Sequence, residues 1–234
     1  RVKTLSLGLI VPDKFYELVK NDDIMYLFSP YYVEREYNMP FAYVDITKEY
    51  DNLVNNPNIK KSKIRARDLE NEISKLQQES GYPYIVNIDT VNNLSPVEGK
   101  IIMSNLCSEI MQVQTPSVIN DAQEYVKLGT DISCNLGSTN IVNMMKSPDF
   151  EKSVEIAVRA LTFVTDHSNV EAVPTVKHGN DIAHTIGLGA MGLHTFFALN
   201  AMEYGDEESI EFTDMYFRLL NYYSLKASNK IAKE

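Results

Sequence analysis

The amino-acid sequence predicts an α/β fold whose C-terminal third is mostly helical. In the first half, short apolar runs that end at prolines or turns alternate with amphipathic stretches. After about residue 147 the apolar residues recur at helical spacing instead. The 234 residues, 44% of them hydrophobic, can bury a substantial core, and no glycine- or serine-rich linker divides them. We therefore expect one α/β unit.

Strands are expected where apolar and β-branched residues form short runs with turn residues beside them. Three segments fit this pattern: Leu5–Val11, closed by Pro12, then Ile24–Phe28 and Tyr84–Ile88. Their spacing along the chain leaves room for helices between them, as a mixed α/β fold requires.

Helices are expected where apolar residues recur every three to four positions. Asp13 is a suitable N-cap for a short helix through about Lys20. The charged segment Lys60–Ser80 has an amphipathic pattern and ends at Gly81, a typical helix-terminating residue. The C-terminal third contains four further candidates: Phe150–Asp166, Thr175–His184, Leu188–Leu199 and Glu207–Lys233.

Composition and charge exclude several classes of protein. The net charge of −10 argues against a large basic surface for nucleic acid. No apolar stretch of about 20 residues and no charged-then-apolar leader is present, so we expect no membrane span and a cytoplasmic location. The chain starts at Arg1 without a methionine and stops inside a helical pattern, which indicates an internal fragment of a longer polypeptide.

The most informative segment surrounds the first of only two cysteines. Asn105, Cys107 and Glu109 occupy alternate positions, and in an extended segment such residues project to one face. An amide, a thiol and a carboxylate would then meet in one pocket. Average composition produces this arrangement around a given cysteine only a few times in about a thousand.

The second cysteine, Cys134, lies in the segment DISCNLGS, 27 residues after the first. That separation leaves room for a connection and a return strand. Two cysteines form no disulfide framework, and sparse cysteines in a reducing compartment are more often inert or catalytic than structural.

Taken together, SNLCSEIMQ and DISCNLGSTNI resemble the catalytic chain of ribonucleotide reductase, most closely the large subunit of the bacterial class Ib enzymes, although class Ia is a near alternative. Other segments resemble the same subunit in the same order: RVKTLSLGLIVPDKF, DDIMYLFSPY, ESGYPYIVNIDTVN, IGLGAMGLH and NYYSLKASNKIAKE. The resemblance covers essentially the whole chain. It implies that residues 1–234 are the central part of the catalytic barrel domain, with the N- and C-terminal portions of the subunit missing.

The resemblance implies a ten-stranded α/β barrel, built from two five-stranded halves, with the radical cysteine on a finger loop. It also implies reduction of ribonucleoside diphosphates to deoxyribonucleoside diphosphates. Cys107 would carry a thiyl radical, Glu109 would act as general base, and Asn105 would hold the ribose hydroxyls. Leu106 and Ser108 would complete the substrate-binding segment.

Cys134 would be one member of a redox-active disulfide that supplies two electrons, with its partner outside this chain. The radical would come from a dimetal small (beta) subunit, and a thioredoxin- or glutaredoxin-like protein would restore the dithiol. The family also implies a homodimer of the full subunit, with allosteric nucleotides bound elsewhere. We expect no cofactor bound in this fragment, and no activity from it alone.

Two other classes of function remain open. A thiol hydrolase would use Cys107 as nucleophile with a histidine base, and it predicts a Cys–His hydrogen bond. A non-catalytic acidic helical scaffold predicts that Asn105, Cys107 and Glu109 diverge and are separately solvated. The four histidines show no metal-ligand spacing, so we expect no metal site.

The segment Gly187–Gly192 matches the dinucleotide pattern G-x-G-x-x-G literally. The residues before it are polar and helix-like, whereas a dinucleotide site needs a buried strand that runs into the turn. We interpret these glycines as sites of close helix packing.

Overall fold

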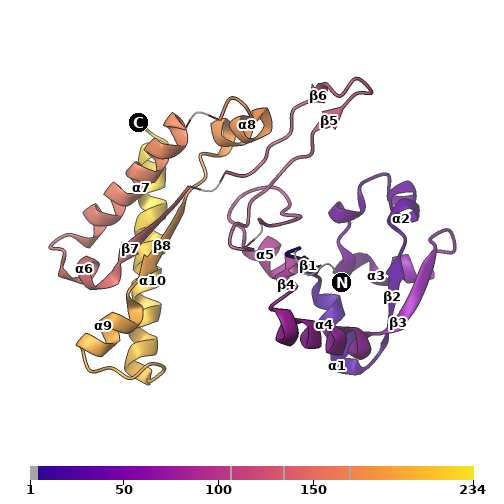
Figure 1. Ribbon diagram of the computed structural model, residues 1–234, viewed down its shortest axis with the longest axis horizontal. Helices are drawn as coiled ribbons and strands as arrows, with labels where there is room; N and C mark the ends of the chain where they lie inside the picture. The colour runs from indigo at the N-terminus through magenta and orange to yellow at the C-terminus, as the bar shows by residue number, and fades with distance from the viewer. Residues whose placement is uncertain (1–4, 106, 134, 169) are drawn as a thin grey trace. The chain divides into compact units, whose positions relative to one another are not determined.

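The computed structural model describes residues 5–105, 107–133, 135–168 and 170–234 (Figure 1). The chain forms two compact units, Arg1–Gln114 and Thr115–Glu234, hereafter unit 1 and unit 2. The mixed α/β composition predicted from the sequence is confirmed. The expectation of one unit rested on the absence of a flexible linker, and two compact cores can form without one. The assignment of residues 1–234 to one barrel domain stays a prediction.

Unit 1 contains two small sheets. β1 (Gly8–Val11) and β4 (Tyr84–Asn87) pair in parallel. β2 (Ile24–Phe28) and β3 (Lys61–Arg65) pair antiparallel. The connection from β1 to β4 contains the second sheet and several helices, as a parallel pair requires a long crossover.

The helices of unit 1 pack around these strands. They are α1 (Asp13–Asn21), α2 (Pro30–Tyr37), the 3₁₀ turn η1 (Phe41–Tyr43), α3 (Ile46–Asn55), α4 (Ala66–Ser80) and α5 (Ile88–Leu94). Leu53 and Val33 are fully buried in one apolar cluster, and Ala66 and Tyr50 are buried in a second. The apolar faces of short helices therefore supply most of this core.

Unit 2 is built on a second parallel pair, β7 (Leu136–Asn140) and β8 (Gly187–Met191). A small hairpin, β5 (Val118–Ile119) and β6 (Tyr125–Lys127), precedes it. The helices are α6 (Ile141–Lys146), α7 (Phe150–His167), α8 (Pro174–Ala183), α9 (Leu193–Leu199) and α10 (Glu207–Ile231). The long helices α7 and α10 lie side by side (Figure 1) and bury Val154, Val158 and Tyr216 between the elements of this unit.

Most predicted elements are confirmed. The strand predicted at Ile24–Phe28 coincides with β2, and the helix predicted at Phe150–Asp166 differs from α7 by one residue. Gly81 ends α4 with a positive φ of 74°, as expected of a glycine cap. None of the helices described is long and apolar enough to cross a membrane.

Two predictions in unit 1 are wrong in detail. The helix predicted over Lys60–Ser80 begins only at Ala66, because Lys61–Arg65 pairs with β2 as strand β3. Asp13 is the first residue of α1 rather than its N-cap, a position held by Pro12. The α1 N-terminus is capped from outside the helix, since the Asp89 carboxylate accepts the Asp13 N–H at 2.7 Å.

The interpretation of the glycine motif is also wrong. Residues 187–191 form strand β8, not the start of a helix over Leu188–Leu199. A Cβ added at Gly187 would lie 2.5 Å from Leu136 on the neighbouring strand, so this glycine permits close strand packing. A dinucleotide site is not formed either, because the first two glycines lie inside the strand instead of in the turn after it.

Candidate functional site

The cysteine segment of unit 1 forms a turn rather than the extended strand expected from its alternating pattern. The Ser108 N–H donates to the Asn105 carbonyl at 3.0 Å, and Ser108 has a positive φ of 62°. The alternation prediction failed because an asparagine side chain offers nearby N–H groups an alternative to strand pairing. Leu106 lies outside the described residues.

The turn is closed by the Asn105 side chain. Its Oδ1 accepts the backbone N–H of Glu109 at 3.1 Å and that of Ile110 at 3.0 Å. Ser104 adds a further tie, since its Oγ donates to the Ile110 carbonyl at 2.7 Å. Among the residues described, Asn105 Nδ2 has no partner, so this amide can still donate to a ligand but its oxygen is already occupied.

The turn presents its two reactive side chains outward. Cys107 is a free, exposed thiol, and Glu109 is exposed. Both ends of the segment are anchored, because Ile101 and Ile110 are only 2% and 8% exposed. A buried anchor on each side and an exposed thiol at the turn suit a group that must react with a molecule from outside the unit.

A cavity of about 270 Å³ adjoins this turn. Strands β1 and β4 form one wall and the cysteine segment forms the other; its lining residues are Ser6, Gly8, Ile10, Val86, Met103, Ser104, Asn105 and Ser108. The hydroxyl, amide and apolar groups in this lining can contact a small polar ligand.

A pair of tyrosines, one on β4 and one just before it, lies near Cys107, and no sequence motif marks this pair. The rings of Tyr82 and Tyr84 meet edge to face with centroids 5.0 Å apart, and Ser6 Oγ donates to the Tyr82 hydroxyl at 3.0 Å. The hydrogen bond with Tyr82 raises the pKa of Tyr84 most, and burial and the nearby Cys107 raise it further. No local sequence signal joins these residues to a cysteine more than 20 positions later.

The second cysteine motif lies in unit 2, at the start of β7. Cys134 itself lies outside the described residues. Asn135, beside it, donates from Nδ2 to Thr165 Oγ1 at 2.6 Å and accepts the Gly187 N–H at 2.8 Å. Ser133 Oγ is buried and has no partner in the described part of the chain.

The segment before Cys134 is tied to α8. The Asp131 N–H donates to the Thr175 carbonyl at 3.1 Å, and the Thr175 hydroxyl donates to the Asp131 carboxylate. Thr175 and Thr165 are only 6% and 3% exposed. Buried threonines of this kind position the motif, and their role depends on contacts across the fold that the sequence does not reveal.

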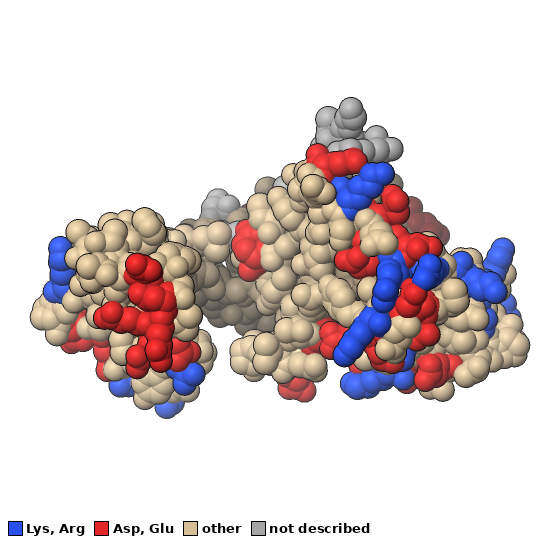
Figure 2. Space-filling view, turned by 90° about the horizontal axis from the view of Figure 1, so that it is seen from below, with Lys and Arg blue, Asp and Glu red and all other residues tan. Residues whose placement is uncertain are grey.

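Charged side chains are mixed over the surface. Figure 2 shows acidic and basic side chains close together on the face in view. In unit 1, for example, Arg65 and Arg67 both pair with Asp22. Within the described residues, no group of three histidine, cysteine, aspartate or glutamate side chains is arranged to hold a metal ion.

The fold and the turn together define a thiol-bearing α/β protein, built on parallel strand pairs, with an exposed cysteine beside a small cavity of mixed polar and apolar lining. The family model of the ribonucleotide reductase barrel domain matches residues 1–234. The chain belongs to this family.

Curated relatives agree with this assignment. The chain is 45% identical over 235 residues to the ribonucleoside-diphosphate reductase subunit alpha of Mycoplasma pneumoniae, covering 100% of this chain and 33% of that protein. It is 42% identical over 236 residues to the Bacillus subtilis subunit alpha, covering 100% of this chain and 34% of that protein. The subunit alpha of Chlamydia pneumoniae is 30% identical over 246 residues, which cover 100% of this chain and 22% of that protein. The chain spans about a third of the length of the first two relatives.

Proposed function

We propose that the protein to which this chain belongs is the catalytic subunit of a ribonucleotide reductase, which reduces ribonucleoside diphosphates to deoxyribonucleoside diphosphates. The observation that carries this proposal is the exposed Cys107 thiol, held on a closed turn beside a small cavity with hydroxyl and amide groups in its lining, in a chain that matches the barrel family over its whole length. The ten-stranded barrel with Cys107 on its finger loop belongs to the same proposal.

The turn geometry supports distinct roles for its three side chains. Cys107, as a thiyl radical, removes the 3′ hydrogen atom of the ribose and becomes a thiol. Glu109 takes the 3′-hydroxyl proton. Asn105 holds the sugar by donation from Nδ2, since its oxygen already accepts two backbone N–H groups. Leu106 and Ser108 belong to the same substrate-binding segment.

Cys134 supplies reducing equivalents in this scheme. The 2′ hydroxyl leaves as water, and a dithiol made of Cys134 and a cysteine outside this chain provides two electrons and two protons by closing into a disulfide. The Cys107 thiol returns a hydrogen atom to C3′ at the end of the cycle. A thioredoxin- or glutaredoxin-like protein then reopens the disulfide.

The proposal implies partners beyond this chain. A dimetal small (beta) subunit generates the radical, the full subunit forms a homodimer, and allosteric nucleotides bind outside residues 1–234. We assign the protein to the class Ib branch. We infer a cytoplasmic location because the dithiol cycle needs a reducing compartment.

The two rival functions are less well supported. A thiol hydrolase needs a histidine beside Cys107, and unit 1 contains none, because all four histidines of the chain lie between residues 167 and 194. A scaffold predicts separately solvated side chains; Cys107 and Glu109 are both exposed, while the Asn105 side chain is tied to the Glu109 backbone N–H. Membership of the reductase family also favours the main proposal.

The test uses the full-length subunit with its radical-generating partner subunit, a dithiol reductant and cytidine diphosphate. We expect deoxycytidine diphosphate from the wild type and none from Cys107→Ser. The isolated 234 residues should give no product, since they lack the second reducing cysteine. Normal turnover by Cys107→Ser would refute the proposed role of this thiol.

A further inference from the structure

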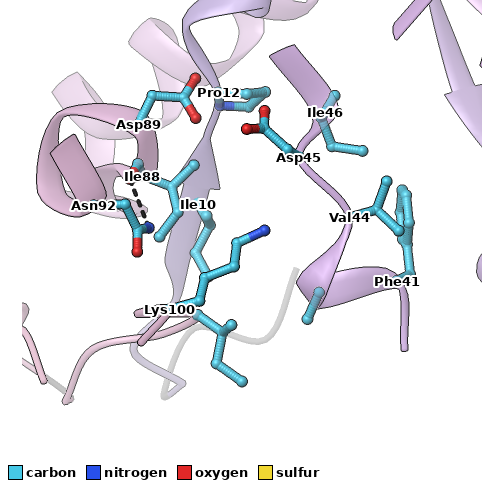
Figure 3. Close-up of a pocket in the computed structure, with 12 residues that line it drawn as sticks. Ile10, Pro12, Phe41, Val44, Asp45, Ile46, Ile88, Asp89, Asn92 and Lys100 are labelled. Atoms are coloured by element: carbon cyan, nitrogen blue, oxygen red, sulfur yellow. Dashed lines mark hydrogen bonds between the residues drawn. The ribbon is translucent and has the colours of Figure 1, made fainter. Parts of the chain in front are cut away.

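A second cavity, of about 280 Å³, lies in unit 1 (Figure 3). None of its lining residues belongs to the cysteine turn. It opens between α5, the start of α3 and the segment 100–102. Most of its lining is apolar, from Ile10, Pro12, Phe41, Ala42, Val44, Ile46, Ile88 and Ile102, and the polar lining residues are Asp45, Asp89, Asn92 and Lys100. This combination of an apolar wall and a few polar groups is typical of a small-molecule site.

The Lys100 ammonium extends into this space (Figure 3). Its Nζ donates to the Tyr43 carbonyl at 2.7 Å, and no carboxylate of the described residues lies within ion-pair distance of it. An ammonium has three N–H donors, so two remain uncommitted. Burial lowers the pKa of Lys100, which indicates that water does not fully solvate the charge.

The other polar groups of the cavity already have partners. Asp45 caps α3 by accepting the Lys48 N–H at 3.1 Å, and it forms an ion pair with the Lys48 ammonium. Asp89 accepts the Asp13 N–H at the start of α1 and the Thr47 hydroxyl. These donors offset much of the negative charge of both carboxylates.

Both polar atoms of the Asn92 side-chain amide also have hydrogen-bond partners. Its Nδ2 donates to the carbonyls of Ile88 and Ile101, and its Oδ1 accepts the Ile101 N–H at 2.8 Å. Lys100 is therefore the polar group in this lining with the greatest unused capacity to bind a ligand.

We propose that this cavity is a binding site for a small organic monocarboxylate, whose carboxylate meets the Lys100 ammonium and whose apolar body lies against Phe41, Val44 and Ile88. The site is separate from the proposed thiol chemistry and requires no reaction. It shares one lining residue, Ile10 of β1, with the cavity beside the cysteine turn.

The chemistry of the lining favours this class of ligand over its neighbours. A phosphate dianion needs more than one cation, and the only ammonium in this lining is that of Lys100. A neutral apolar molecule would leave the Lys100 donors unpaired in a partly dry space. A cation would meet the Lys100 ammonium, and the Asp45 and Asp89 carboxylates already accept from other donors.

Binding of benzoate to the full-length subunit tests the proposal, by ligand-observed NMR or calorimetry. We expect Lys100→Met to weaken benzoate binding about tenfold or more, because a charge-assisted hydrogen bond is lost. The matched control is Lys63→Met, which removes an exposed lysine of the same unit outside the cavity and should bind as the wild type does. Benzyl alcohol, which has a similar shape and no charge, should bind more weakly than benzoate.

A second variant tests the cavity itself without removing a buried group. Ala42 is exposed at the cavity, so Ala42→Leu should leave folding intact and reduce benzoate binding by occupying space. The proposal is overturned if the wild type binds no benzoate, if Lys100→Met binds it normally, or if inorganic phosphate displaces the Lys100-dependent benzoate at lower concentration than acetate does. Equal binding of benzyl alcohol would likewise overturn the assigned role of Lys100.

Discussion

The side-chain oxygen of Asn105 accepts the backbone N–H of Glu109 at 3.1 Å, which joins the amide of the motif to the residue proposed as its base. The same oxygen also accepts the N–H of Ile110. Asn105 therefore has a structural role in the turn as well as a proposed role toward substrate. The two roles use different atoms of one amide, Oδ1 for the turn and Nδ2 for the ligand, so substitutions can separate them.

Asn105→Ala should open the turn, whereas Asn105→Asp should keep it closed and lose only the Nδ2 donor. Each lost hydrogen bond contributes about 1 kcal/mol, so the Glu109 and Ile110 amides should exchange with solvent about fivefold faster in the alanine variant. Hydrogen exchange of the full-length subunit measures this effect. We expect both variants to lose product formation, and fast exchange in Asn105→Asp would contradict the separation of roles.

Glu109→Ala should abolish product formation and leave the fold almost unchanged. The side chain is exposed and none of its contacts with the described residues holds the turn, so the change in unfolding free energy should be within about 0.5 kcal/mol. The matched control is Glu98→Ala, an exposed glutamate of the segment before the turn, which should keep full activity. The assay is deoxynucleotide formation with the partner subunit, alongside thermal unfolding.

The sequence predicted elements well where pattern and pairing agree. Ile24–Phe28 is an apolar and aromatic run, and it forms β2. Lys61–Arg65 is mostly charged and was assigned to a helix, but pairing with β2 makes it a strand. Residues 187–191 are rich in glycine and gave no strand signal, although they pair in parallel with β7. Tertiary pairing overrides local propensity in both cases.

The candidate site was predicted by residue type but not by geometry. The motif identified Asn105, Cys107 and Glu109, while the turn that joins them depends on hydrogen bonds that a residue pattern does not encode. The Tyr82–Tyr84 pair was missed because it approaches Cys107 only through folding. Long-range contacts of this kind need coordinates.

Gly179→Ala should destabilise unit 2 and disturb the segment that leads to Cys134. A Cβ at this position would lie 2.1 Å from the Asp131 carbonyl oxygen, a backbone atom that cannot move alone. Alanine normally favours a helix over glycine by about 1 kcal/mol, but a clash with backbone outweighs that gain. We expect a lower unfolding temperature of the full-length subunit and reduced product formation.

Gly8→Ala is the control for this substitution, because a Cβ at Gly8 meets nothing within 4 Å. It should leave the unfolding temperature close to that of the wild type. An unfolding temperature for Gly179→Ala equal to that of Gly8→Ala would show that α8 can move away from Asp131 at little cost.

Acid should weaken the contact between α7 and α10 through Glu155. Its Oε1 accepts from Lys230 Nζ at 2.8 Å and from Arg159 Nε at 2.9 Å. These two hydrogen bonds lower the pKa of Glu155 from the ordinary 4.5 to about 2, and the bond with Lys230 has the larger effect. A carboxylate whose pKa is lowered by folding stabilises the fold at pH values above its pKa in the unfolded chain. This contribution is lost as the pH falls toward its pKa in the folded chain. The loss should therefore occur between about pH 4.5 and about pH 2.

Glu155→Gln should remove this part of the acid sensitivity. Thermal unfolding of the full-length subunit at about pH 5 and about pH 3 measures it, because Glu155 loses part of its contribution between those values. The wild type should lose more stability over this interval than Glu155→Gln does. Glu211→Gln, which changes an exposed glutamate on α10, should retain the wild-type difference. If Glu155→Gln and the wild type lost equal stability, the Glu155–Lys230 contact would not hold the two helices together in solution.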